Sequence, residues 1–260
     1  MSDDLEAGPI GAFSVAGKVA LVTGARREIG RAIARALGAQ GATVAVHHVG
    51  NAEETADAAR VVAEIGGGAR AFAADFAEDA AAIRLAAEVT AAFGRVDILV
   101  LNASIELPED YREVTRDRFD LQVAVNLRST LELLQALVPP MEAAGWGRVL
   151  TIGSVQQELP HPRMLVYAAT KAAQFNWVLN LARQVGGRGV TVNNLAPGAI
   201  LTARNRVQMR TEGAALEQRI PVGRLGTPDD LVGAALLLCS DAGRYITGAN
   251  LFVDGGRHIA

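Results

Sequence analysis

Residues 19–30 read VALVTGARREIG. An apolar, β-branched run ends at Thr23 and passes directly into a turn that opens with Gly24, and Gly30 follows six residues later. A glycine turn between a strand and the N-terminus of a helix lets the backbone approach a pyrophosphate, and the first N–H groups of the helix face that anion. This stretch therefore predicts a dinucleotide site on a strand–turn–helix unit.

The alternation of short apolar runs with longer alanine-rich runs continues along the chain. We expect strands at 19–23, 43–46, 69–74, 98–101, 148–152, 191–195 and 250–253, and helices near 29–40, 52–66, 79–93, 116–138, 164–186 and 228–239. Strands and helices that alternate at this spacing form crossover units and a parallel sheet. The prediction is a Rossmann-like, doubly wound α/β sheet of about seven mainly parallel strands with helices on both faces. Pro139 and Pro140 should end or kink the fifth helix.

No linker rich in Gly, Ser or Pro divides the chain. We expect a flexible N-terminal arm over residues 1–15 and a single dinucleotide-binding catalytic domain over residues 16–260. Residues 199–224 are polar, rich in arginine and follow the sixth strand, and we expect them to be irregular. Because ligands of open parallel sheets bind beyond the carboxyl ends of the strands, this segment is a candidate substrate lid.

The composition argues against several classes of protein. A net charge of -3 gives no basic footprint for nucleic acid, and the single Cys239 excludes an internal disulfide and a cysteine-based metal site. We predict no metal. No apolar run is long enough to span a membrane, and the acidic N-terminus is no secretory signal. The expected location is cytoplasmic, with a small-molecule substrate and neither nucleic acid nor membrane as partner.

Tyr167 and Lys171 lie four residues apart, and Ser154 lies thirteen residues before Tyr167. Positions i and i+4 share a helix face, so a lysine ammonium would lie beside a phenol. A free phenol has a pKa of about 10, and a nearby cation stabilises its ionised form. With a serine hydroxyl to hold the substrate oxygen, the three side chains would transfer a proton to or from a carbonyl or a secondary alcohol.

With these residues the chain resembles the short-chain dehydrogenase/reductase family over residues 18–256. The family turn T-G-x-x-x-G-x-G is matched at Thr23, Gly24 and Gly30, and N-N-A-G is degraded to Leu101-Asn102-Ala103-Ser104. The resemblance implies catalytic roles for Asn126, Ser154, Tyr167 and Lys171. It implies cofactor contacts for Gly24, Arg26, Arg27, Ile29, Gly30, His47, Asp75, Phe76, Asn102, Ala103, Ser104, Tyr167, Lys171, Pro197, Gly198, Ile200 and Thr202.

The resemblance also implies finer roles for some of these residues. Asn126 would position a water that links Lys171 to solvent, and Lys171 would contact the nicotinamide ribose. Ile200 and Thr202 would grip the nicotinamide carboxamide. The helices near 116–138 and 164–186 would pack against their copies in a homotetramer, with the C-terminal strand forming a second contact.

The turn departs from the family pattern at Glu28, which stands where the family has its middle glycine. If the position needs a positive φ, a side chain there costs about 1–2 kcal/mol. The second strand ends His47-His48-Val49-Gly50-Asn51, with no carboxylate for a ribose 2′-hydroxyl. Arg26 or Arg27 would bind a 2′-phosphate through paired donors. We therefore expect NADP as the preferred cofactor, with NAD possible, and expect one of the two histidines to pack under the adenine and the other to face solvent.

Three hypotheses remain for the activity. Polar residues near the reacting carbon, with Glu106, Gln156 and His161 as candidate substrate contacts, favour an NAD(P)-dependent dehydrogenase of a sugar, polyol or other small polar carbonyl, similar to bacterial glucose dehydrogenases. The alternative is a 3-oxoacyl-[acyl carrier protein] reductase. Arg188 matches one of the basic positions that dock an acidic carrier, but the other is Gly145. The third is a non-catalytic nucleotide sensor, against which the intact catalytic residues argue.

Overall fold

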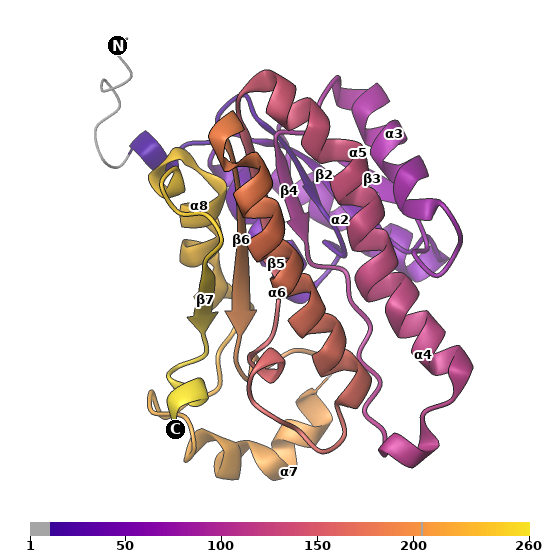
Figure 1. Ribbon diagram of the computed structural model, residues 1–260, viewed down its shortest axis with the longest axis vertical. Helices are drawn as coiled ribbons and strands as arrows, with labels where there is room; N and C mark the ends of the chain where they lie inside the picture. Colours follow the sequence, from indigo (N-terminus) through magenta and orange to yellow (C-terminus); the bar gives the residue numbers. More distant parts are fainter. Residues whose placement is uncertain (1–10, 204) are drawn as a thin grey trace.

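The computed structural model describes residues 11–203 and 205–260. The strands of these residues form one sheet in the order β3-β2-β1-β4-β5-β6-β7, and every neighbouring pair is parallel. They are β1 (Val19–Val22), β2 (Thr43–His48), β3 (Arg70–Ala73), β4 (Ile98–Leu101), β5 (Gly147–Ile152), β6 (Val190–Pro197) and β7 (Asn250–Val253). The predicted doubly wound α/β fold is confirmed (Figure 1).

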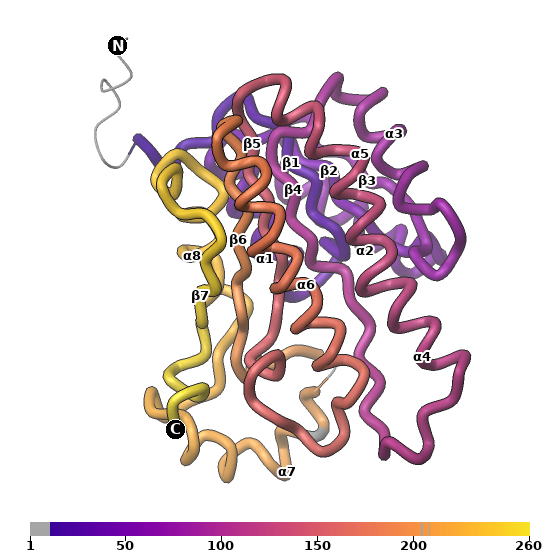
Figure 2. Tube along the Cα trace, viewed as in Figure 1, coloured from indigo at the N-terminus to yellow at the C-terminus, as the bar shows by residue number. Residues whose placement is uncertain are grey.

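Helices cover both faces of the sheet, and each face has its own apolar core. The principal helices are α1 (Glu28–Ala39), α2 (Ala52–Ile65), α3 (Ala81–Phe93), α4 (Arg116–Val123), α5 (Ser129–Ala144), α6 (Leu165–Val185), α7 (Arg206–Glu217) and α8 (Val232–Cys239). Side chains of α1, α2 and α8 share one core, and side chains of α3, α5 and α6 share the other. Figure 2 shows α5 and α6 in front of the sheet and α1 behind it.

The predicted arm overlaps the described residues only in part. Residues 1–10 lie outside the described residues. Val15 is buried in the core of α1 and α2, and its N–H donates to the carbonyl of Gln40 at 3.0 Å. The chain is therefore packed against the domain from Val15 onward.

The helix expected at 116–138 does not end at its prolines. It consists of α4, a π-helical turn at Ala124–Arg128, and α5, which passes through Pro139 and Pro140 and ends at Ala144. Both prolines are exposed, while Leu137 and Met141 on the opposite side are buried. Burial of that apolar face outweighs the lost backbone bonds, because water can satisfy the solvent-facing carbonyls.

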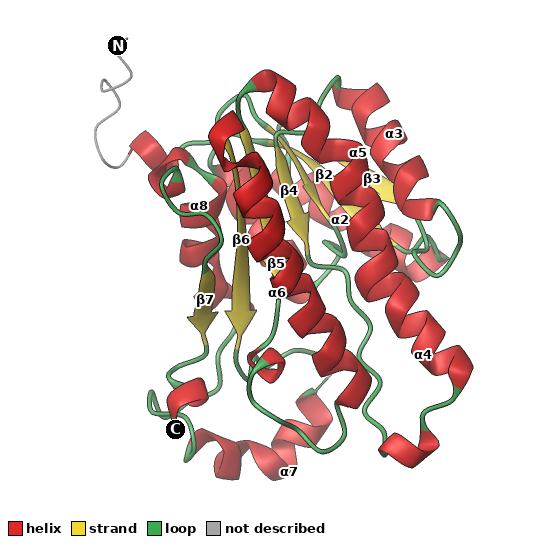
Figure 3. Ribbon diagram, in the orientation of Figure 1, coloured by secondary structure: helices red, strands yellow, loops and turns green. Residues whose placement is uncertain are grey.

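The expectation of an irregular segment at 199–224 is wrong, because α7 lies inside it. The sequence hides this helix, since no side chain caps its first turn and Gly213 interrupts its centre. Figure 3 shows α7 and the loops around it beyond the carboxyl ends of β6 and β7. This is the edge of the sheet at which open α/β folds bind ligands. We call residues 199–203 and 205–217 the lid segment.

Candidate active site

The turn after β1 is held by hydrogen bonds to the loop after β4. The hydroxyl of Thr23 donates to the carbonyl of Val100. It also accepts the backbone N–H groups of Asn102 and Ala103, both at 2.9 Å. The side-chain amide of Asn102 donates back to the carbonyls of Thr23 and Gly24, at 2.8 and 3.1 Å. These bonds join β1 to β4 where the strand order reverses, which is the ligand-binding point of this fold.

Gly24 and Gly30 allow neighbouring parts of the chain to approach this turn closely, because neither carries a side chain. Gly24 has a φ of 63°, a conformation that favours glycine. A Cβ on Gly30 would overlap the carbonyl oxygen of Gly24 and lie 2.6 Å from the Asn102 amide. Ile29 packs against the core beneath. The turn and the free N–H groups at the start of α1 therefore fit the pyrophosphate of a dinucleotide.

His47, predicted to contact the cofactor, is buried beneath the turn instead. Its Nδ1 accepts the N–H of Gly24 at 3.0 Å, and its Nε2 lies 2.9 Å from the carbonyl of Ala74. Its ring stacks on Phe76 with centroids 4.4 Å apart. Burial lowers the pKa of His47 to about 4, so the ring is neutral and donates from Nε2. His47 supports the turn, and its effect on a cofactor would act through Gly24.

His48 is also buried, so the expectation that one of the two histidines faces solvent is wrong. Asp75 lies in the loop after β3 and accepts the N–H of Ala77 at 2.9 Å. Ser104, after β4, donates its hydroxyl to the side-chain oxygen of Asn126 at 3.2 Å. His48, Asp75 and Ser104 thus lie at or just after the carboxyl ends of β2, β3 and β4, the edge of the sheet that carries the turn.

The two arginines of the turn differ in their surroundings. Arg26 is held between two carboxylates of α2, with Glu54 at 2.9 Å and Asp57 at 2.8 Å, and only 11% of its side chain is exposed. Glu54 also accepts the N–H of Val49, the residue that follows β2, at 2.8 Å. Arg27 is exposed to solvent. The carboxylate of Glu54 on α2 therefore lies against the backbone that follows β2 and beside Arg26, and sequence reasoning missed this residue.

Glu28 adopts the positive φ that its position in the turn suggested, with a value of 51°. Its carboxylate accepts the backbone N–H of Ala203 in the lid segment at 2.8 Å. The departure from the glycine pattern therefore creates a contact between the turn and the lid segment.

Ser154, Tyr167 and Lys171 lie around the carboxyl end of β5. Lys171 is 2% exposed, and its ammonium donates to the carbonyl of Ile152 at 2.8 Å. The same ammonium lies 5.7 Å from the centroid of the Tyr167 ring. Ser154 caps a short 3₁₀ turn, and its Oγ accepts the N–H of Gln156 at 3.2 Å. The serine hydroxyl proton remains available for a substrate oxygen, because the bond to Gln156 uses only a lone pair.

Asn126 lies on the π-helical turn and connects three elements. Its side-chain oxygen accepts the N–H of Ile105 at 2.9 Å, and its side-chain nitrogen donates to the carbonyl of Ile105 and to the hydroxyl of Thr170, both at 3.0 Å. Its backbone carbonyl accepts the amide of Gln174 at 2.7 Å and the hydroxyl of Thr130 at 2.9 Å. Asn126 thus fixes α6 against the loop after β4, and the water relay stays a prediction.

Sequence reasoning missed Gln174, because the Tyr-x-x-x-Lys spacing carries no information about the helical turn that follows it. It is buried on the same helix as Lys171, and its amide also donates to Thr130 at 2.9 Å. The signal available in the sequence was a polar residue three positions after Lys171, on the side of α6 that should face the core.

The polar segment after Ser154 lies between β5 and α6. Gln156 and Gln157 each bury one polar side-chain atom that has no hydrogen-bond partner among the described residues. Gln157 also accepts the amide of Asn194 at 3.1 Å. His161 is exposed, and its Nδ1 accepts the N–H of Arg163 at 3.2 Å. Glu106 is partly buried in the loop after β4, so of the three candidate substrate contacts His161 is the most exposed.

The lid segment leaves the sheet at Gly198, directly after Pro197 at the end of β6. A Cβ on Gly198 would lie 2.6 Å from the Cα of Asp254, so this close crossing requires glycine. The N–H and hydroxyl of Thr202 both donate to the side chain of Asn205, at 2.9 and 3.3 Å. Ile200 lines a small cavity of about 210 Å³ at the base of the segment. Ile200 and Thr202 thus begin the lid segment at the carboxyl edge.

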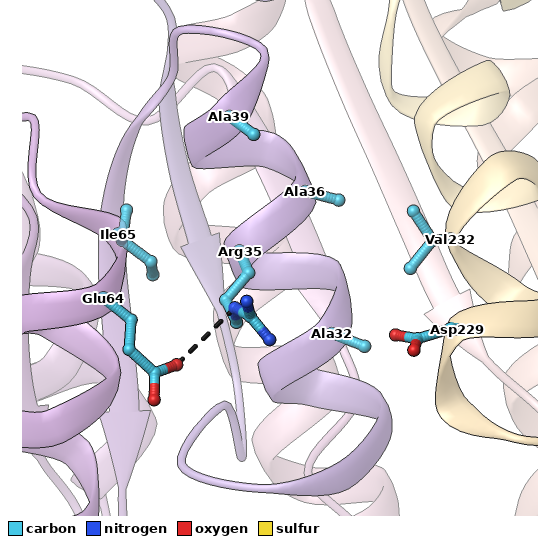
Figure 4. Close-up of a pocket in the computed structure, with 8 residues that line it drawn as sticks. All are labelled: Ala32, Arg35, Ala36, Ala39, Glu64, Ile65, Asp229 and Val232. Carbon is cyan, nitrogen blue, oxygen red and sulfur yellow. Dashed lines mark ion pairs between the residues drawn. The ribbon is translucent and has the colours of Figure 1, made fainter.

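A larger groove, of about 480 Å³, lies outside this region (Figure 4). It runs between α1, the end of α2 and the start of α8, and its charged pair is Arg35 and Glu64 at 3.5 Å. None of the predicted site residues lines it. Within the described ranges no group of three or more His, Cys, Asp or Glu side chains could hold a metal ion. No described helix is long and apolar enough to cross a membrane.

A dinucleotide turn after β1, together with a Tyr-x-x-x-Lys pair on the helix after β5, defines a nicotinamide-dependent oxidoreductase of alcohols and carbonyls. Comparison with known proteins agrees with this class. The sequence model of a family described as enoyl-(acyl carrier protein) reductase matches residues 24–258. The chain belongs to the short-chain dehydrogenase/reductase family.

Several relatives match almost the whole chain. A D-threitol dehydrogenase of Mycolicibacterium smegmatis is 39% identical over 95% of this chain and 95% of its own length. A 3-oxoacyl (acyl-carrier-protein) reductase of Agrobacterium tumefaciens with NADP bound is 40% identical, covers 94% of this chain and 95% of its own, and superposes with a TM-score of 0.86. A putative NAD(P)-dependent gluconate 5-dehydrogenase of Beutenbergia cavernae with bound NADP is 39% identical, covers 96% and 100%, and has a TM-score of 0.89.

Proposed function

We propose that this oxidoreductase interconverts a secondary alcohol and a ketone on a small, polyhydroxylated substrate and prefers NADP to NAD. The observation that carries the reaction is the cluster at the end of β5, where the Lys171 ammonium lies 5.7 Å from the Tyr167 ring centroid and Ser154 keeps a hydroxyl proton to donate. A bound nicotinamide supplies or accepts the hydride at the substrate carbon.

The side chains of this cluster handle the proton on the substrate oxygen. Tyr167 gives the proton to the oxygen during reduction and takes it during oxidation. Ser154 donates a hydrogen bond to the same oxygen as negative charge develops on it. The buried ammonium of Lys171 stabilises the Tyr167 phenolate by charge attraction, and its bond to the carbonyl of Ile152 fixes its position. Asn126 holds α6 against the loop after β4 through its bonds to Thr170 and Ile105.

The substrate class rests on the segment after Ser154. Gln156 and Gln157 hold buried polar atoms that need hydrogen-bond partners, and the hydroxyl groups of a sugar or polyol supply such partners. The D-threitol and gluconate dehydrogenases among the relatives act on molecules of this kind. Glu106, Gln156 and His161 are the proposed substrate contacts.

NADP is the proposed cofactor because Arg27 is exposed beside the turn and two similar structures carry NADP. Arg27 would hold the 2′-phosphate, while Arg26 is already neutralised by Glu54 and Asp57.

The second candidate is reduction of a 3-oxoacyl group on an acyl carrier protein, which the Agrobacterium relative favours. Against it, Arg188 is paired with Glu142 at 3.1 Å, and Gly145 stands at the other basic docking position. An acidic carrier would therefore meet less positive charge here than such docking requires.

We also propose a cytoplasmic homotetramer. Phe119, Leu131, Leu165 and Leu179 of α4, α5 and α6 are exposed apolar side chains, each at least 44% exposed. Strand β7 pairs with β6 alone and forms an edge of the sheet. Both features supply surface for contacts between copies, and light scattering at micromolar concentration tests the mass; a monomer would contradict the proposal.

The function is tested with a panel of sugars, polyols and β-ketoesters, each with NAD(H) and NADP(H), followed at the absorbance of the reduced nicotinamide. Turnover of polyols or sugars with NADP supports the proposal. Turnover of β-ketoesters alone supports the acyl-carrier alternative, and cofactor binding without any turnover would indicate a nucleotide sensor.

A further inference from the structure

Glu28 stands in a strained conformation at the edge of the proposed cofactor site. Among the described residues, only Glu28 and Ala80 have a positive φ without being glycine. A side chain costs about 1–2 kcal/mol in this conformation. Such strain persists only where the surrounding structure imposes it, and it concentrates at functional sites.

The contact that accompanies this strain crosses between two parts of the site. Glu28 Oε1 accepts the N–H of Ala203 at 2.8 Å, and the two residues are 175 positions apart in the sequence. Ala203 follows Thr202 in the lid segment, and Glu28 is the first residue of α1. One hydrogen bond therefore joins the phosphate-binding turn to the start of the lid segment.

The Glu28 carboxylate is an internal anion at a helix N-terminus. Its charge interacts favourably with the positive end of α1, as a phosphate group would. The pyrophosphate of a dinucleotide would be drawn to the same end of α1, and two anions at one helix terminus repel each other. The Glu28 side chain is partly exposed and Ala203 is exposed, so an entering ligand has access to the bond.

We propose that Glu28 is a positioning residue that holds the lid segment against the turn while no cofactor is bound, and that its bond to Ala203 breaks when the pyrophosphate enters. The inference rests on the proposed function, because it needs a dinucleotide at this turn. Glu28 thereby couples cofactor entry to release of the segment that borders the substrate.

The first test measures the lid segment in the cofactor-free protein. Hydrogen exchange at residues 199–203 should be slow in the wild type and several-fold faster in Glu28→Gly, which removes the acceptor. Glu28→Gln keeps a neutral acceptor and should lie between them. Glu88→Gln is the matched control, since Glu88 is exposed on α3 and its replacement makes the same change of charge. Equal exchange in the wild type and Glu28→Gly would overturn the inference.

The second test separates the pyrophosphate from the rest of the cofactor. Glu28→Gly should bind NADPH roughly 5- to 20-fold more tightly than the wild type, because it lacks the competing carboxylate. Adenosine 2′-monophosphate carries no 5′-phosphate, so no anion of this ligand occupies the pyrophosphate position and its affinity should not change. The KM for NADPH should fall together with its Kd, because the carboxylate that competes with the pyrophosphate is absent.

The outcomes separate this inference from the proposed function. Equal gains for NADPH and adenosine 2′-monophosphate, or the same gain in Glu88→Gln, would overturn the role of Glu28 and leave the function standing. A wild-type protein that binds neither NADPH nor NADH would overturn the proposed function, and the inference about pyrophosphate entry with it.

Discussion

The two ends of the candidate site are built in different ways. At the catalytic end, at β5 and α6, the Lys171 ammonium donates to a neutral partner, the carbonyl of Ile152. The phosphate end, at β1, α1 and α2, is governed by charge, as Arg26 is held by Glu54 and Asp57 and Glu28 reaches Ala203. Spacing along one helix thus brings Lys171 beside Tyr167 at the first end, whereas ion pairs between separate elements arrange Arg26 at the second.

The largest effect should come from breaking the catalytic end. Tyr167→Phe keeps the ring but removes the proposed acid/base, so kcat should fall by about 10²- to 10⁴-fold. The Kd for NADPH, measured by fluorescence titration, should change little, because the phenol is not the main anchor of the cofactor. Lys171→Ala should impair turnover and cofactor binding together. Near-full activity of Tyr167→Phe on a good substrate would place the proton donor elsewhere.

Acid should lower the free energy of unfolding of the protein through His47, which lies beneath the turn of the phosphate end. Its pKa is lowered by burial from 6.5 to about 4, so between these values the unfolded state binds the extra proton. The stabilisation is therefore complete above pH 6.5 and is lost as the pH falls toward 4, by up to about 3 kcal/mol.

Urea unfolding at pH 7, 5.5 and 4.5 measures this dependence. His47→Asn keeps a neutral donor and acceptor, so it should be less stable at pH 7 but should lose less stability on acidification than the wild type. Parallel pH curves for the two proteins would mean that the titrating group is another one.

Substitution of Arg27 tests which of the two arginines of the turn selects NADPH over NADH. Arg27→Ala removes charge-assisted bonds to a 2′-phosphate, so the Kd for NADPH should rise by about 10-fold or more while that for NADH stays nearly constant. Arg26→Ala is the matched comparison, and calorimetry with both cofactors measures the four values. A larger loss of NADPH affinity in Arg26→Ala would show that the arginine leaves its carboxylate partners when the cofactor binds.

The smallest expected effect is a change in the ratio of cofactor affinities on substitution of Glu54. Glu54→Gln keeps an acceptor for the N–H of Val49 but removes one negative charge beside Arg26. The ratio of NADH to NADPH dissociation constants should therefore shift toward NADPH by a factor of about 2 to 5. The shift should shrink in high salt, and a shift toward NADH would mean that the carboxylate does not face the 2′ position.

Local patterns in the sequence predicted most of the fold. Each strand lies within a few residues of its expected range, and for the buried strands β1, β2, β4, β5 and β6 the reason is that a strand buried on both faces is a largely continuous hydrophobic segment. The predictions failed where tertiary packing outweighed the local sequence signals. Burial of Leu137 and Met141 carries α5 through its prolines, and α7 forms despite weak helix signals.

Sequence patterns alone were enough to predict the parallel sheet, the glycine turn after β1, and the family to which the chain belongs. It also placed Tyr167 and Lys171 on one helix, since residues four apart share a face whatever packs around them. Tertiary packing was needed to pair Glu54 of α2 with Arg26 of the turn, to place His47 beneath Gly24, and to bond Glu28 to Ala203. These contacts join residues distant in the sequence, and they form because folding brings separate elements to the same edge of the sheet.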